Sequence, residues 1–275
     1  MFKYCLVVTF FINFASSAPS KNSTNGDATP CLRDFFQAAY DGTYNCTKTY
    51  DFFSENSKTS PFIDGKSCFL EIAKEECSSS QYNLLSTKYQ DFLDVITKKS
   101  TDCSSIYYKY NALKCVIIAE DLNIKEVMIV KRHLKINDSR ALEAIGLCEK
   151  VQNCMKANCY PENELTIINS YCETLKMSNT EFKACEYQIK KESPDMSEYK
   201  CLEGFDFLDQ SILAQIQIYR EKKDCTKEIM KDICGEKAVK DFDKYADLTA
   251  EFWLKTAKMN VAITNEWTEN DQKEG

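Results

Sequence analysis

The side chains with the most reactive chemistry in this 275-residue chain are its fifteen cysteines. Cysteines a few residues apart, such as Cys148, Cys154 and Cys159, are found in zinc sites. Such sites use Cys-x2-Cys pairs or several histidines, whereas this sequence has no such pair and a single histidine, His133. The alternative is oxidation: apart from Cys5, the cysteines number fourteen, and an even number predicts disulfides, here seven. The fourteen are Cys31, Cys46, Cys68, Cys77, Cys103, Cys115, Cys148, Cys154, Cys159, Cys172, Cys185, Cys201, Cys225 and Cys234.

Sequence motifs for other catalytic chemistry do not occur in the chain: it has no GxSxG, HExxH, P-loop or GxGxxG pattern. The histidine lies in a basic amphipathic stretch, Lys125 to Lys135 (KEVMIVKRHLK), which is typical of a helix with its apolar side in the core. Contact with an anionic lipid or glycan is the alternative interpretation of this stretch. The 42 acidic residues leave room for a glycosidase-like carboxylate pair, but acids spread along helices usually face water. We therefore expect no enzymatic activity, no catalytic residue, no cofactor and no bound metal.

The first residues have the features of a secretory signal. Lys3 supplies a positive charge, Leu6 to Ala15 is an apolar run, and small residues follow up to Ala18. We predict a signal peptide over residues 1–18, which removes Cys5, and a disordered Ser/Thr/Asn-rich leader over residues 19–30. No later segment approaches the roughly 18 apolar residues of a membrane-spanning helix. The chain is therefore expected to be secreted and extracellular, without a transmembrane segment.

Two further features fit an extracellular protein. Three N-x-S/T sequons, at Asn22, Asn45 and Asn137, predict N-linked glycans. The formal net charge of −7 argues against a nucleic-acid partner, because nucleic-acid binders carry a basic surface.

The elements that position the cysteines are predicted to be helices. With only seven Gly and five Pro, the sequence is unlike a turn-dense β-sandwich, and 44% hydrophobic residues are enough to form a core. Apolar residues recur at helical spacing, as in the series from Leu85 to Ile96. Helix starts are predicted at Ser178, which has Glu three residues later, and at Ser193, which precedes Pro194. The fold class is therefore all-α.

An internal repeat organises the cysteines. Four of them recur later in the chain in the same register, with matching aromatic and acidic residues between them. The matching elements are Cys31-x14-Cys46 with Cys185-x15-Cys201, Cys46-x3-Tyr50-Asp51-Phe52 with Cys201-x3-Phe205-Asp206-Phe207, and Cys68-x8-Cys77 with Cys225-x8-Cys234.

The ten cysteines from Cys103 to Cys234 resemble a known pattern. The order Cys103-x11-Cys115, a long helical stretch, Cys148, Cys154, Cys159, Cys172, Cys185, Cys201 and Cys225-x8-Cys234 resembles the nematode-expanded secreted family called domain of unknown function nineteen. The resemblance implies a secreted, cysteine-rich helical protein with no assigned activity. It divides the chain into a four-cysteine half copy over residues 31–100, a complete ten-cysteine domain over 101–262 and a polar tail over 263–275. The expected architecture is a disulfide-stapled helical bundle of one and a half repeats.

The repeat also constrains the disulfide pairing. If both copies share one scheme, the first four cysteines pair among themselves, the last four do the same, and the middle six pair with one another. Nine residues of α-helix place Cys68 and Cys77 on the order of 13 Å apart, beyond the ~7 Å that a disulfide spans. Cys31 and Cys46 are therefore predicted to link separately to Cys68 and Cys77, in either of two pairings. The last four cysteines should follow the same pattern.

Two classes of function fit these features. One is an extracellular interaction module that binds a protein or glycan partner. The other is a carrier of a small apolar ligand, with the apolar segment Phe205 to Tyr219 (FDFLDQSILAQIQIY) as a helix that lines the cavity.

Overall fold

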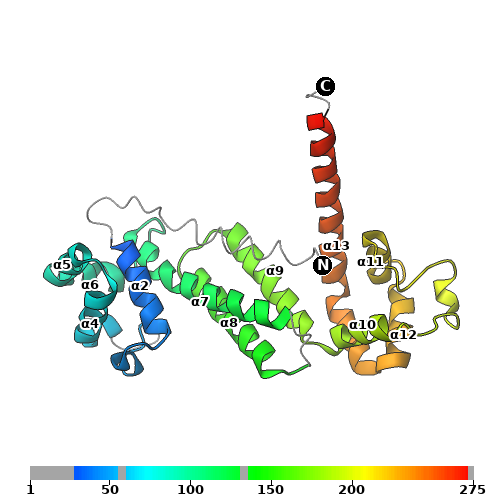
Figure 1. The fold of residues 1–275 in the computed structure, drawn as a ribbon, viewed down its shortest axis with the longest axis horizontal. Coiled ribbons are helices and arrows are strands. Elements are labelled where there is room, and N and C mark those ends of the chain that lie inside the picture. The colour runs from blue at the N-terminus through cyan, green and yellow to red at the C-terminus, as the bar shows by residue number, and fades with distance from the viewer. Residues whose placement is uncertain (1–27, 55–59, 131–135, 272–275) are drawn as a thin grey trace. The chain divides into compact units, whose positions relative to one another are not determined.

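The computed structural model describes residues 28–54, 60–130 and 136–271 of the chain. Within these ranges all regular structure is helical and no strand occurs, which confirms the all-α prediction (Figure 1). The α-helices are α2 (Thr29–Tyr40), α3 (Pro61–Asp64), α4 (Lys66–Glu76), α5 (Ser79–Thr87), α6 (Tyr89–Thr97), α7 (Ile106–Val130), α8 (Ser139–Ala157), α9 (Glu162–Ser178), α10 (Glu181–Glu192), α11 (Ile212–Tyr219), α12 (Lys223–Cys234) and α13 (Glu236–Asp271), with the 3-10 helices η1 (Asn45–Lys48) and η2 (Lys200–Leu202).

Packing divides the described chain into two compact units. One contains α2 to α8 and the part of α9 up to Cys172, and the other contains the rest of α9 with α10 to α13. The sequence repeat has its boundary near residue 100, whereas the boundary between the two compact units falls between Cys172 and Glu173. The first four-cysteine copy therefore packs in one unit with the helices that begin the second copy.

We call α2 to α6 the first module. Its core is made largely of phenylalanine rings: Phe35 lies at the centre, with ring centroids 4.9 Å from Phe52 and 4.7 Å from Phe69. Phe62 of the short helix α3 contacts the same rings, at 5.1 Å from Phe52 and 5.6 Å from Phe69. Edge-to-face aromatic packing of this kind contributes beyond the apolar area that it buries.

Helix α7 covers the side of this core that the first module leaves open. Its residues Tyr110, Leu113 and Ile117 are buried in the same apolar cluster as α2 and α4. Polar contacts line the edge of this interface. They are the Arg33–Glu120 ion pair, with N and O 2.5 Å apart, and the Tyr40 hydroxyl, which donates to Asp121 at 2.7 Å. The first module thus takes part of its core from beyond residue 100.

We call α10 to α13 the second module. Its core contains the rings of Phe182, Tyr219 and Phe242, one from each of α10, α11 and α13. The buried face of α13 carries small side chains, including Ala238 and Ala246, which let α10, α11 and α12 pack closely on it. The three shorter helices of this module therefore pack against a face of α13.

Two predicted helix starts are wrong. Ser178 is the last residue of α9, and α10 is capped instead by Thr180, whose hydroxyl accepts a hydrogen bond from the Lys183 amide at 3.3 Å. Ser193 marks the end of α10 and has a left-handed backbone with φ 45°. No α-helix follows it until residue 212: apart from the 3-10 helix η2, residues 194–211 form a bent segment.

Other predicted boundaries shift. Helix α2 begins at Thr29, inside the predicted leader of residues 19–30, and Thr29 is buried. The apolar series from Leu85 to Ile96 is buried as expected, but two helices carry it, separated at Lys88. The segment 205–219 is helical only from Ile212. The backbone of α13 continues to Asp271, through most of the predicted tail of residues 263–275.

Several predicted features lie outside the described residues: the signal peptide of residues 1–18, most of the leader with Asn22, and His133. Among the residues that the structure does describe, no helix is both long and apolar enough to cross a membrane.

Candidate interaction site

The two modules are closed by the same pair of nested disulfides. Cys31 pairs with Cys77 and Cys46 with Cys68, and the later copy repeats this with Cys185–Cys234 and Cys201–Cys225. The pairing confirms that Cys68 does not bond Cys77 at the end of α4, and that Cys225 does not bond Cys234 of α12. In each module one bridge joins the first two turns of the first helix to the C-terminal end of the second. The other bridge joins the chain after the first helix to the first turn of the second, so the two bridged helices run antiparallel.

The remaining six cysteines pair among themselves, as predicted. Their bridges are Cys103–Cys159, Cys115–Cys154 and Cys148–Cys172. They tie α7 to α8 and α8 to α9, and the seven bridges together account for all fourteen cysteines after residue 18.

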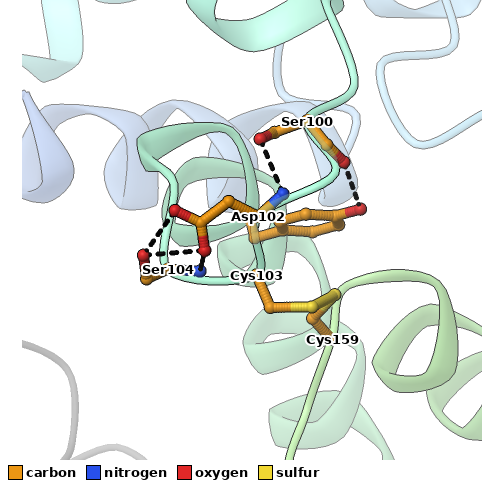
Figure 2. Close-up of a disulfide and its surroundings, with 6 residues drawn as sticks. Ser100, Asp102, Cys103, Ser104 and Cys159 are labelled. Carbon is orange, nitrogen blue, oxygen red and sulfur yellow. Dashed lines mark hydrogen bonds between the residues drawn. A yellow bond between two sulfur atoms is a disulfide. The ribbon is translucent and has the colours of Figure 1, made fainter.

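The bridge at Cys103 fixes the connection between the first module and α7 (Figure 2). In this turn the Asp102 carboxylate accepts hydrogen bonds from the amide and hydroxyl of Ser104, at 2.9 Å each. The amide hydrogen bond holds the pKa of Asp102 below its usual range. Ser100 accepts from the Asp102 amide at 3.0 Å, and its carbonyl accepts from the Tyr108 hydroxyl at 2.9 Å. The turn is therefore fixed on both sides of the disulfide.

The acidic residue of the repeated motif has the same structural role in both modules. Asp51 accepts a hydrogen bond from the Phe53 amide at 2.9 Å, and Asp206 accepts one from the Leu208 amide at the same distance. This Asx turn directs the aromatic residue in between, Phe52 or Phe207, into the core, where each is buried. The repeat of Cys-x3-aromatic-Asp-Phe is thus explained by a turn.

A tyrosine two residues before the inner cysteine is a further shared feature, which the sequence reasoning missed. The Tyr44 hydroxyl donates to Glu76 at 2.7 Å, and this hydrogen bond raises the pKa of Tyr44 to about 12. Tyr199 occupies the matching position beside Asp232, and burial together with that carboxylate raises its pKa. Aligning the two copies by Cys46 and Cys201 would have revealed this pair.

A surface hollow of 740 Å³ opens in the bent segment between α10 and α11. Disulfide Cys201–Cys225 holds the middle of this segment against α12, and Gly204 makes a turn there with φ 73°. Half-buried Tyr199 and Phe205 line the hollow together with Met196. Exposed charged residues alternate with these apolar residues along the chain. The full lining is Pro194, Asp195, Met196, Ser197, Tyr199, Lys200, Leu202, Glu203, Phe205, Asp206, Phe207 and Leu208.

The predicted cavity-lining segment, residues 205–219, borders the hollow at its start, but the space beside its helical part is far smaller. Gln215, Ile218 and Tyr219 border a space of about 10 Å³, together with Phe207 and Leu208. A space of this size holds about one water molecule. The inward-facing residues of its helix, Ala214, Gln215, Ile218 and Tyr219, are buried in the core.

A buried charge cluster lies next to that small space. The Glu186 side chain is only 15% exposed and lies 2.5 Å from each of the ammonium groups of Lys183 and Lys190. Burial and the charge of the same carboxylate raise the pKa of Tyr219. Burial acts to raise the pKa of Glu186, but the two lysines outweigh it and lower the pKa to about 2. The core of the second module thus contains a carboxylate that is paired with two ammonium groups.

The predicted glycosylation sites at Asn45 and Asn137 lie on the surface. Asn45 begins the 3-10 helix η1 and is exposed, although its neighbour Cys46 is bridged. Asn137 is exposed in the turn before α8, with φ 60°. Both side chains are therefore sterically open to a glycan.

Comparison with known proteins agrees with this arrangement of bridged cysteines, which we call the disulfide frame. The family model described as Domain of unknown function (DUF19) matches two segments, residues 16–104 and 103–253. No curated protein and no solved structure matches the chain. The first segment carries two of the seven bridges and the second carries the other five, consistent with one partial and one complete copy. The chain belongs to the Domain of unknown function (DUF19) family.

Proposed function

We propose that this protein is a secreted, disulfide-braced interaction module without catalytic activity, which binds an extracellular protein through the hollow of the second module. Seven disulfides suit an oxidising compartment, and the signal-like residues 1–18 support export to it. The exposed sequons at Asn45 and Asn137 support N-glycosylation along that route.

The observation that carries the proposal is the hollow itself. Its 740 Å³ falls in the range of about 300–1,000 Å³ that is typical of binding pockets. Aromatic and charged side chains alternate along its lining, a mixture that suits protein recognition better than a purely apolar ligand. Because Cys201–Cys225 braces the segment, little conformational freedom is lost when a partner binds.

A blocking substitution tests the binding site. Ser197 is exposed on the rim of the hollow, so Ser197→Trp fills it without changing charge, and Ser80→Trp places the same bulk on exposed α5 of the first module. The measurement is cross-linked capture from extracellular fluid by the glycosylated protein, with mass spectrometry of the captured chains. We expect one partner with wild type and with Ser80→Trp, and its loss with Ser197→Trp. Equal capture by all three proteins would refute the site.

A separate measurement tests the lack of catalysis. Panels of hydrolase and transferase substrates should show no turnover by the secreted protein. An activity that a single Asp or Glu substitution removes would make the protein an enzyme.

A further inference from the structure

The charges around the hollow are unbalanced. Its lining contains the carboxylates of Asp195, Glu203 and Asp206 but only one ammonium group, that of Lys200. All four residues are exposed, so their charges face the solvent from which a partner arrives. The lining therefore presents a net negative surface.

Carboxylates on neighbouring parts of the module strengthen this negative field. Asp232 and Glu228 of α12, and Glu198 of the bent segment, all act on the Tyr199 side chain in the hollow, and their charges add to burial in raising its pKa. A cation at Tyr199 would therefore be attracted by these three carboxylates as well as by those of the lining.

The aromatic side chains of the hollow are suited to cations as well. The face of an aromatic ring attracts an ammonium or guanidinium group. One ring already has such a neighbour in this chain: Lys222 Nζ lies 6.0 Å from the centre of the Phe205 ring and donates to the Cys201 carbonyl at 2.8 Å. The edge of the hollow thus holds one ammonium group of the protein itself.

One charge beside the repeated motif differs between the two modules. Glu203 lies two residues after the inner cysteine Cys201, and the residue two after the matching Cys46 is Lys48. The aromatic and acidic residues that follow are the same type in both copies, Tyr50-Asp51 and Phe205-Asp206. The frame is therefore shared, while one exposed charge is reversed.

We propose that the hollow binds a positively charged peptide segment of the partner protein, whose Lys or Arg side chains lie over Tyr199 and pair with the surrounding carboxylates. This inference rests on the proposed function, because it names the chemistry of the partner at the same site. Asp195 and Asp206 also hold turns of the backbone through the amides of Ser197 and Leu208. Glu203 is the carboxylate whose replacement tests charge with the least effect on these turns.

The test uses the whole glycosylated protein and three labelled twelve-residue peptides: one rich in Lys and Arg, one of Gly and Ser, and one rich in Asp and Glu. Fluorescence anisotropy should show binding of the basic peptide only, with affinity that falls at least fivefold between 50 and 300 mM salt, as expected when exposed charges are screened. Glu203→Lys should weaken this binding about tenfold or more. Glu71→Lys, the same change on exposed α4, should leave the affinity within twofold.

Circular dichroism and a thiol count on each variant establish that the frame is intact. Equal binding of the three peptides, or equal affinity of Glu203→Lys and wild type, would overturn the inference. If Ser197→Trp still abolishes partner capture in that case, the hollow is the binding site and only the basic partner is wrong. If Ser197→Trp has no effect on capture, the proposed function itself fails.

Discussion

The two four-cysteine modules have the same nested disulfides but differ in the side chains that are packed between the bridged helices. The residue after Cys31 is Leu32, which is fully buried, whereas the residue after Cys185 is Glu186. One turn later in the same helices, buried Phe36 corresponds to Lys190, the ion-pair partner of Glu186. An apolar pair in one copy has thus become a charged pair in the other.

The second bridged helix shows the same exchange. Phe69 follows Cys68 and stacks on Phe92, with ring centroids 4.9 Å apart. Thr226 follows Cys225, is also buried, and donates its hydroxyl to the Ile218 carbonyl at 2.9 Å. The disulfides thus fix the course of the helices in both modules, while the interior accepts either aromatic packing or a satisfied polar network.

The modules also differ in how they are closed. The first has two short helices, α5 and α6, after Cys77, and depends on α7 for part of its core. The second has the continuous helix α13 after Cys234, and three lysines of α12 form ion pairs along it: Lys223–Asp247, Lys227–Asp243 and Lys231–Glu236. In the second module the long helix α13 therefore covers the core in place of a separate helix such as α7.

The largest expected effect is common to both modules. Replacing Cys31 and Cys77 together with alanine should lower the free energy of unfolding by about 4 kcal/mol, and replacing Cys185 and Cys234 by a similar amount, because the closed loops are of similar length. Urea denaturation followed by circular dichroism measures both. A loss in only one module would show that the two frames are not equivalent.

The charged core of the second module gives the next effect. Glu186→Ala leaves Lys183 and Lys190 close together without their carboxylate, and we expect a loss of about 3 kcal/mol. The double change Glu186→Leu with Lys190→Phe introduces the residues of the first module and should recover most of that loss. Thermal unfolding compares them. A double variant no more stable than Glu186→Ala would show that the two interiors are not interchangeable.

Acid should affect the second module more than the first through this carboxylate. The folded pKa of about 2 lies below the ordinary value of 4.5, so the unfolded chain binds the proton more readily. The contribution of Glu186, about 3 kcal/mol, is therefore full above about pH 5.5 and is lost as pH falls toward 2. Unfolding measured from pH 7 to 2 should show a smaller slope for Glu186→Leu with Lys190→Phe than for wild type; parallel curves would contradict this.

The smallest effect concerns the contact between the first module and α7. Arg33 and Glu120 are each more than a third exposed, so Glu120→Gln should cost only about 0.5 kcal/mol. Ile117→Ala in the same interface removes a fully buried side chain and should cost several times more. A larger loss from Glu120→Gln would mean that charge, not apolar burial, joins α7 to the module.

Much of the frame could be predicted from the sequence because cysteine spacing and helical periodicity are local patterns. The choice between the two pairings was not predictable, since it depends on α2 and α4 running antiparallel, which is a tertiary property. The apparent helix start at Ser193 failed for a related reason: the serine and proline match a capping pattern, but the chain turns there through a left-handed residue.

The candidate site was harder to predict than the frame. The hollow lies in a segment with backbone turns at Gly204 and Asp206, and such turns alone do not indicate that a hollow lies beside them. Glu186 was hidden among helical acids that usually face water. Once the copies are aligned by Cys31 and Cys185, its match to the apolar Leu32 is the signal that marks it as buried.

The measurement that most directly tests the shared frame is disulfide mapping of the secreted protein by proteolysis and mass spectrometry without reduction. The structure predicts Cys31–Cys77 and Cys46–Cys68 in the first module, the same nesting in Cys185–Cys234 and Cys201–Cys225, and no thiol that can be labelled under denaturing conditions. A crossed pairing in either module, or a bridge from the first four cysteines to a residue beyond 100, would contradict it.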